Sequence, residues 1–161
     1  MKQVGTIALD MDGTITDKNH LIPSEVADFF LTLYSKGWQF IFITGRPFSF
    51  AFAALSKLRF PYLLGVQNGA DLIKMPEKKY IQNFYLNSDI LEILETIYKD
   101  KEEDFLIYTG FKKGDFCYYR PAHFSNQGTA YLERLQTLGE EPWIPLDNFD
   151  GSECESFPLI K

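Results

Sequence analysis

The sequence has few cysteines and no excess of basic residues. Its two cysteines, Cys117 and Cys154, lack the spacing of a metal site or of a disulfide framework. The 22 acidic residues outnumber the 16 basic ones, and the net charge of −6 disfavours binding to nucleic acid or to an anionic membrane. No apolar run approaches the length of a membrane span, and no basic-then-apolar leader opens the chain. We therefore expect a cytoplasmic protein that binds neither nucleic acid nor membrane.

The composition is that of a folded protein. Hydrophobic residues make up 45% of the chain and aromatic residues 16%, which argues against disorder. A length of 161 residues allows one good hydrophobic core or two small lobes.

The most informative segment, IALDMDGT, spans residues 7–14. An apolar run leads directly into two carboxylates, Asp10 and Asp12, and a glycine that permits a tight turn. Two neighbouring carboxylates repel each other, which implies a bound cation or a shared proton. With the hydroxyl of Thr14, the segment predicts an oxygen-rich site for Mg²⁺ and phosphate. The alternative is a loop with two solvated aspartates.

A second segment, FIFITGRP, spans residues 40–47 and has the same design. An apolar strand runs into the hydroxyl of Thr44 and the guanidinium of Arg46, and Pro47 suits the first turn of a helix. Hydroxyls, backbone amides and a helix N-terminus together form an anion site. Alternatively, Thr44 caps the helix and Arg46 is a surface charge.

The hydrophobic periodicity predicts an α/β arrangement in the first half of the chain. The predicted strands are 4–9, 39–43 and 62–66, and the predicted helices are 24–36 and 48–58. Strands that alternate with helices imply right-handed parallel crossovers, and ligands then bind beyond the carboxyl ends of the strands. Asp10, Thr44 and Asn68 each follow a predicted strand, so we expect them at one edge of the sheet.

The pattern changes after Ala70 to one typical of an α+β domain. We predict a hairpin of 72–74 and 79–81, a helix at 88–99, paired strands at 105–108 and 116–119, a helix capped by Ser125, and a last strand at 157–160.

Together the two segments resemble the haloacid dehalogenase (HAD) superfamily of phosphohydrolases. The DxDGT motif is complete at residues 10–14, and Thr44 begins the second motif. The Thr44-Gly45-Arg46 sequence, followed by 66–70 (VQNGA), resembles the Cof-type branch, whose cap is inserted after the third core strand. The resemblance implies a partial Rossmann-like parallel sheet core at 1–78 and an α+β cap domain at 79–161.

The resemblance also implies an activity, namely Mg²⁺-dependent hydrolysis of a small phosphorylated metabolite, such as a sugar phosphate. Asp10 would be the nucleophile that forms an aspartyl-phosphate, Asp12 the general acid and base, and Thr44 a hydrogen-bond donor to the phosphoryl group. Mg²⁺ would bind the Asp10 carboxylate and the Asp12 backbone carbonyl. The implied substrate-binding residues are Thr14, Gly45, Arg46, Asn68 and Gly69.

The sequence departs from the family after the predicted cap begins. A complete member has a later lysine and a later acidic motif. Residues 126–130 have the outline of the lysine motif, but Gln127 stands at the lysine position. Residues 147–151 are acidic, but no clear core strand precedes them. We expect that the chain lacks the C-terminal half of the core; the alternative is a compact, diverged and self-sufficient protein.

Other functions remain open at this point. The missing motifs favour a non-catalytic binding or regulatory protein, and a phosphomutase would share the aspartyl-phosphate chemistry. A receiver-type signalling domain is disfavoured, because Asn68 stands where such a domain carries its aspartate. An incomplete core would favour a homo-oligomer or a complementing C-terminal core segment. We expect His20 to be a loop residue, His123 to lie in the cap and Arg120 to pack within a strand.

Overall fold

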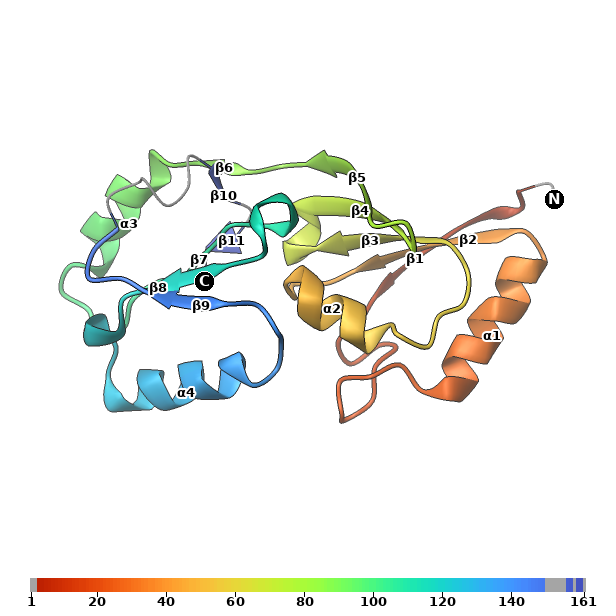
Figure 1. Ribbon diagram of the computed structural model, residues 1–161, viewed down its shortest axis with the longest axis horizontal. Coiled ribbons are helices and arrows are strands. Elements are labelled where there is room, and N and C mark those ends of the chain that lie inside the picture. Colours follow the sequence, from red (N-terminus) through yellow and green to blue (C-terminus); the bar gives the residue numbers. More distant parts are fainter. Residues whose placement is uncertain (1–2, 150–155, 158, 161) are drawn as a thin grey trace. The chain divides into compact units, whose positions relative to one another are not determined.

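The computed structural model describes residues 3–149, 156–157 and 159–160, and the chain divides into two compact units (Figure 1). The first unit is Met1–Asn83 and the second is Phe84–Lys161. Each is described by itself below.

The first unit is built on a five-stranded sheet with the strand order β1-β2-β3-β4-β5. Its elements are β1 (Gly5–Asp10), α1 (Ser24–Ser35), β2 (Trp38–Ile43), α2 (Phe48–Ala54), β3 (Tyr62–Val66), η1 (Gln67–Gly69), β4 (Asp71–Met75) and β5 (Lys79–Asn83). The first three strands run parallel, as predicted, and β4 and β5 continue the sheet as an antiparallel hairpin.

The helices of this unit follow the predicted pattern with one correction. Helix α1 matches the predicted range closely, whereas α2 ends at Ala54 instead of Leu58. Beyond Ala54 the backbone forms three-residue turns, with the amides of Ser56 and Leu58 bonded to carbonyls three residues earlier. Leu55 is buried in these turns, before the chain enters β3. The helix therefore ends four residues before the apolar pattern in the sequence does, because tertiary packing sets its end.

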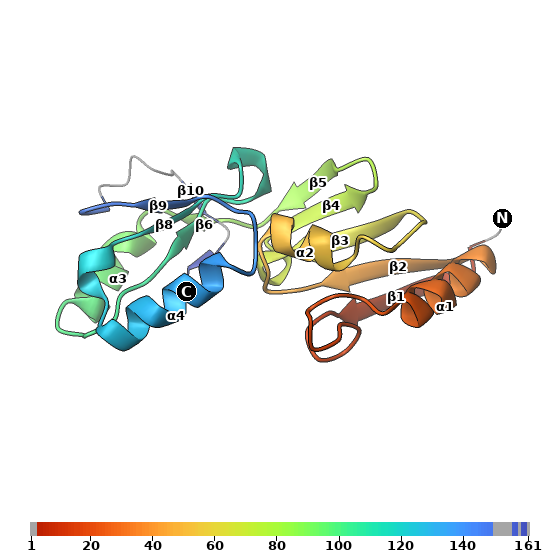
Figure 2. The same cartoon turned by 60° about the horizontal axis from the view of Figure 1, so that its bottom comes forward.

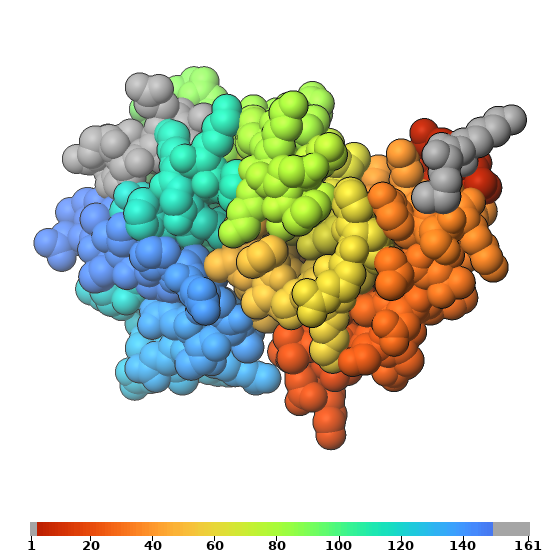
Figure 3. All heavy atoms as spheres, turned by 45° about the vertical axis from the view of Figure 1, so that its right-hand side comes forward, coloured from red at the N-terminus to blue at the C-terminus, as the bar shows by residue number. Residues whose placement is uncertain are grey.

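The core of the first unit lies between the sheet and the helices α1 and α2, which cover the same face (Figure 2). Alternate residues of a strand point to opposite faces, and Phe40 and Phe42 point from β2 towards α1. The ring of Phe30 from α1 lies 5.0 Å from that of Phe40 and 5.8 Å from that of Phe42. The outer side of α1 (orange in Figure 3) exposes Phe29 to 59%.

The two edges of this sheet differ in how they are protected from pairing with another strand. The β5 edge begins with Lys79, and the register between β4 and β5 shifts at Leu72 and Ile73. Charges and bulges of this kind discourage edge-to-edge association. Strand β1 instead pairs with β2 in a regular register, and the segment 3–9 carries no charged side chain. The β1 edge is therefore open to a further strand.

The second unit is an α+β arrangement, as predicted. Its elements are β6 (Leu86–Asn87), α3 (Ile90–Tyr98), β7 (Ile107–Tyr108), η2 (Phe111–Lys113), β8 (Cys117–Tyr119), η3 (Pro121–His123), α4 (Asn126–Gln136), β9 (Trp143–Pro145), β10 (Ser156–Phe157) and β11 (Leu159–Ile160). Ser125 caps α4 as predicted, with its hydroxyl accepting a hydrogen bond from the Gly128 amide at 3.0 Å.

The sheet of the second unit lies between its two helices (Figure 1). Phe105 and Ile107 pack with Leu91 of α3, whereas Leu106 and Tyr108 pack with Leu132 of α4. This alternation is the period-two pattern of a strand that is buried on both faces. The order of the four-stranded sheet is β11-β7-β8-β9.

The predicted last strand at 157–160 is divided in two. β10 pairs with β6, and β11 pairs with β7, so the two short strands belong to different sheets. In the part of the chain that the structure describes, no helix is both long enough and apolar enough to cross a membrane.

Candidate active site

The predicted site residues of the first unit follow the carboxyl ends of its parallel strands. Asp10 is the last residue of β1, Thr44 follows β2, and Asn68 lies in η1 after β3. Parallel strands place their carboxyl ends at one edge of the sheet, where ligands bind in α/β folds. The expected placement of these residues is therefore found.

The loop after β1 leaves Asp10 exposed. Gly13 has φ +73°, a conformation that favours glycine, and it turns the chain back. The carbonyl of Met11 accepts hydrogen bonds from the amides of residues 14, 15 and 16, at 3.1 to 3.3 Å. This turn brings the Thr14 hydroxyl to 3.2 Å from Asp10 Oδ2, where it donates a hydrogen bond.

Asp12 and Arg46 form the strongest polar contact of the site. Arg46 Nε lies 3.1 Å from each Asp12 carboxylate oxygen, and Nη2 lies 2.5 Å from Oδ1. The Thr44 hydroxyl donates to Asp12 Oδ2 at 3.2 Å and accepts from the Arg46 amide at 3.1 Å. The Arg46 side chain is 4% exposed and that of Asp12 is 50% exposed.

These contacts set the charge state of Asp12. Hydrogen bonds from Arg46 favour the carboxylate over the acid, and the positive charge of Arg46 and the Thr44 hydroxyl act in the same direction. Partial burial opposes them, but the pKa of Asp12 is lowered from its ordinary value. Asp12 is therefore a carboxylate at neutral pH.

The loops after β2 and β3 are bound to each other. The Thr44 amide donates to the Gly65 carbonyl at 2.9 Å, and the Asn68 amide donates to the Thr44 carbonyl at 2.8 Å. Asn68 and Gly69 have φ values of +60° and +85°, in the left-handed region that Asn and Gly tolerate best. A Cβ at Gly45 would lie 3.0 Å from Asn68 Oδ1, so a larger residue here would require the Asn68 side chain to move by a few tenths of an ångström.

Two residues that the sequence did not single out for the site also contact Arg46. The His20 carbonyl accepts a hydrogen bond from Arg46 Nη1 at 3.1 Å, and the Phe50 ring centroid lies 3.9 Å from the guanidinium carbon. The only sequence signal for Phe50 is its place in the first turn after Pro47. His20 was expected to be a loop residue, and it is one, but its backbone takes part in the site.

The oxygen atoms at this edge could supply part of the coordination shell of a hard divalent cation. Mg²⁺ is usually held by one or two protein oxygens together with water and phosphate oxygens. Among the described residues, the Asp10 carboxylate accepts one hydrogen bond, from Thr14, and forms an ion pair with no side chain. Asp10 and the backbone of Asp12 can therefore act as oxygen ligands. Within residues 3–149, no group of three His, Cys, Asp or Glu side chains could hold a metal.

The segments that resembled the later family motifs lie in the second unit. Gln127 is exposed in the first turn of α4, and Asp147 is exposed after β9. Asp150 and Gly151 fall outside the described residues.

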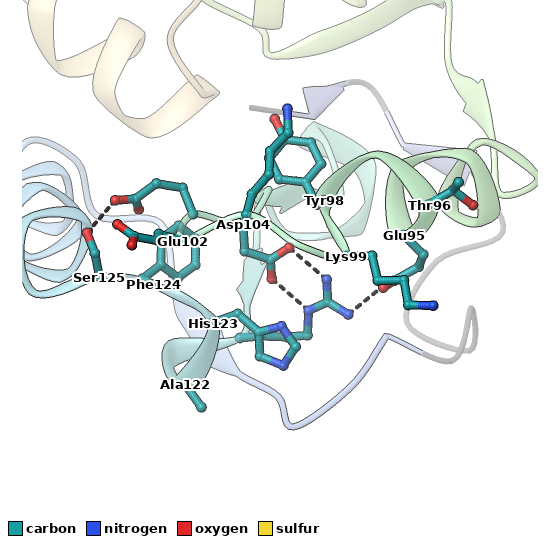
Figure 4. A pocket seen from close by; sticks show the side chains of 13 residues that line it. Glu95, Thr96, Tyr98, Lys99, Glu102, Asp104, Ala122, His123, Phe124 and Ser125 are labelled. Atoms are coloured by element: carbon teal, nitrogen blue, oxygen red, sulfur yellow. Dashed lines mark hydrogen bonds and ion pairs between the residues drawn. The ribbon is translucent and has the colours of Figure 1, made fainter.

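The second unit also contains an open cavity of about 930 Å³ between α3, the segment 101–104 and the N-terminus of α4 (Figure 4). One wall of this cavity is an ion-pair network. Arg120 donates to both carboxylate oxygens of Asp104 at 2.7 Å and to Glu95 at 2.6 Å. Arg120 is thus held by partners within its own unit. His123 and Phe124 also line the cavity.

The comparisons with known proteins identify the family. The family model of haloacid dehalogenase-like hydrolases matches residues 7–144, so the chain belongs to this family. No curated protein matches the sequence significantly.

Solved structures show the same fold at low sequence identity. A haloacid dehalogenase-like hydrolase from Bacteroides thetaiotaomicron has 18% identity and a TM-score of 0.68, over 94% of this chain and 54% of its own. A protein from Plasmodium vivax described as a HAD/COF-like hydrolase has 18% identity and a TM-score of 0.68, over 98% and 55%. A sugar phosphatase of HAD subclass IIB has 14% identity and a TM-score of 0.65, over 95% and 56%. The chain spans about half the length of these structures.

Proposed function

We propose that this chain carries the nucleophile half of a Mg²⁺-dependent phosphohydrolase that acts on a small phosphorylated metabolite. The proposal is supported by one observation: the two neighbouring carboxylates, Asp10 and Asp12, differ in their hydrogen-bond and ion-pair partners. Arg46 and Thr44 bind Asp12, whereas Asp10 accepts, from the part of the chain that the structure describes, only the hydrogen bond of the Thr14 hydroxyl and is exposed at the carboxyl edge of the sheet. An exposed carboxylate beside a hydroxyl donor is suited to attack a phosphorus atom.

The proposed reaction has two steps. In the first, an oxygen of Asp10 forms a bond to phosphorus, the bond from phosphorus to the ester oxygen breaks, and the leaving oxygen keeps the electron pair. That oxygen takes the proton of Asp12 where Asp12 is in its acid form, or leaves as the anion where its alcohol is acidic. In the second, Asp12 removes a proton from water, the water oxygen bonds to phosphorus, and the bond to Asp10 breaks. To donate to a phosphoryl oxygen in both steps, the Thr44 hydroxyl would give up its hydrogen bond to Asp12 Oδ2, because a hydroxyl has a single proton to donate.

The two steps require different protonation states of Asp12. Because Arg46 lowers its pKa, Asp12 is ready to accept a proton from water but must first be protonated before it can donate one to a leaving alcohol. Esters of acidic alcohols need no such proton. We therefore expect p-nitrophenyl phosphate to be a better first substrate than an alkyl phosphate.

The Asp10 carboxylate and the Asp12 backbone carbonyl would hold Mg²⁺. The ion would reduce the repulsion between the anionic nucleophile and the phosphate when bound. A cationic group facing Asp10 and a third acidic ligand would come from outside the described residues, either from a complementing core segment or from a second subunit.

The substrate class and the cap are also parts of the proposal. A sugar phosphatase is among the matched structures, and this supports a sugar phosphate as substrate. The second unit would act as the cap that excludes water and selects the substrate.

Phosphate release from p-nitrophenyl phosphate tests the proposal. We expect turnover with Mg²⁺, none with EDTA, and a loss of at least about a thousandfold in Asp10→Asn. Asp28→Asn, at an exposed position on α1, is the matched control and should retain activity. Turnover that survives in Asp10→Asn would refute the nucleophile assignment.

A non-catalytic binding protein is the second candidate. It is supported by the sequence, because Gln127 stands at the lysine position of residues 126–130 and no clear core strand precedes the acidic residues 147–151. In that case Mg²⁺ and phosphate together would raise the melting temperature, this increase would disappear in Asp10→Asn, and no phosphate would be released.

A further inference from the structure

The contacts of Arg46 indicate that residues outside the family motifs hold its side chain in place. The Arg46 guanidinium is buried, and its donors are directed at Asp12 and at the His20 carbonyl. A side chain held in this way has few donors left for a substrate. Its first role is therefore to fix the position of Asp12.

The His20 carbonyl is presented by a turn that closes on itself. His20 has φ +62°, which is uncommon for a residue with a side chain, and its amide donates to the Asp17 carbonyl at 3.0 Å. Asp17 Oδ1 accepts hydrogen bonds from the amides of Asn19 at 2.9 Å and Leu21 at 3.1 Å. These bonds compensate for the unusual backbone conformation and aim the carbonyl at Arg46 Nη1.

Phe50 supports the same guanidinium from a different element. Its ring centroid lies 3.9 Å from the guanidinium carbon of Arg46, within the range of a cation–π contact, and 5.7 Å from the ring of His20. The Ile22 amide bonds to the Ala54 carbonyl at the end of α2, at 3.0 Å. The turn 17–21 and helix α2 are thus joined by backbone as well as by side chains.

We propose that Phe50 and the turn 17–21 are positioning elements that hold Arg46 against Asp12. They touch neither a substrate nor the reacting atoms in this scheme, and they act through Arg46. Their effect on turnover rests on the proposed function, whereas their hold on Arg46 does not.

The test uses two pairs of variants in the full chain. Phe50→Leu removes the aromatic face but keeps the bulk, and Phe50→Tyr keeps both. Asp17→Ala removes the acceptor of the turn, and Asp17→Asn keeps an acceptor oxygen. Asp17 is exposed, so Asp17→Ala should fold even if Phe50→Leu does not. Phe52→Leu, on the same helix but stacked on Phe48, is the matched control.

The first readout is the exchange of the Arg46 Nε–H proton with water, followed by NMR. We expect exchange to be about three- to tenfold faster in Phe50→Leu and in Asp17→Ala, and close to wild type in the two conservative variants and in Phe52→Leu. Unchanged exchange in both Phe50→Leu and Asp17→Ala, or an equal acceleration in Phe52→Leu, would overturn the proposal.

The second readout is the turnover of p-nitrophenyl phosphate. We expect kcat to fall in Phe50→Leu with KM within about twofold, because Asp12 is displaced while the phosphate site is kept, and we expect Phe50→Tyr to restore kcat. A change in KM alone would contradict positioning through Arg46. If the wild type shows no turnover, this chain alone does not complete the proposed site, and proton exchange still decides whether these residues hold Arg46.

Discussion

Removing Arg120 should leave a buried carboxylate without its counter-ion. The side chains of Arg120 and Asp104 are 4% and 2% exposed, and two hydrogen bonds of 2.7 Å join them. The Arg120 guanidinium carbon also lies 4.5 Å from the Phe149 ring centroid. Breaking a buried ion pair by removing one partner costs about 3–5 kcal/mol. We expect Arg120→Leu to lower the free energy of unfolding of the second unit by that amount.

The same geometry predicts a rescue. Replacing both charges by apolar side chains removes the unpaired carboxylate, so Arg120→Leu with Asp104→Leu should be within about 1 kcal/mol of wild type. Glu95 is 45% exposed, and Glu95→Gln should therefore cost no more than about 1 kcal/mol. Comparing these three variants with wild type distinguishes the contribution of the buried Arg120–Asp104 pair from that of the exposed Arg120–Glu95 pair.

Urea unfolding followed by Trp143 fluorescence measures these free energies. Trp143 lies in β9 of the second unit, and Trp38→Phe removes the fluorescence of the first unit. The reasoning is refuted if Arg120→Leu alone costs less than about 1 kcal/mol. It is also refuted if the double variant is as unstable as Arg120→Leu, because the buried Asp104 carboxylate would then not be the source of the loss.

Two further predictions concern the first unit. The open β1 edge should support concentration-dependent association in sedimentation velocity, which Ala8→Lys should abolish and Ile81→Lys, on the protected β5 edge, should not; a wild type that stays monomeric at every concentration would contradict this. Because the pKa of Asp12 is lower in the folded state, the unfolded state takes up the Asp12 proton first as pH falls. The stabilisation of the folded state by the Asp12 carboxylate is therefore present above about pH 4, the usual aspartate value, and is lost as pH falls through the folded pKa. The difference in unfolding free energy between wild type and Asp12→Asn should shrink over that range in urea titrations, and a difference that does not change with pH would count against the pairing with Arg46.

Much of the first unit could be predicted because its signals are local. Apolar runs of five or six residues ending in a polar residue and a glycine marked β1 and β2 and placed Asp10 and Thr44 beyond them. The parallel pairing followed from the alternation of strands and helices. The length of α2 was predicted less well, because the apolar pattern continued after the buried Leu55 had turned the chain.

The partners of Arg46 could not be predicted in the same way. Its contact with Asp12 joins residues 34 positions apart, and its contact with the His20 carbonyl joins residues 26 positions apart. A backbone carbonyl carries no residue-specific signal, because every residue has one. The role of Arg46 in substrate binding stays a prediction, and its observed contacts are with Asp12, His20 and Phe50.

The sequence by itself determined the order of strands and helices in the first unit, the pair of carboxylates at the end of β1, and the family. These depend on residues that are neighbours in the chain, where strand and helix periodicity, turn glycines and caps act. Only the tertiary structure decided that Arg46 neutralises Asp12 and leaves Asp10 open, and that Arg120 is enclosed by Asp104 and Glu95. The physical reason is that the pairing of charges depends on the distances between their atoms, and only the folding of distant segments against one another sets those distances.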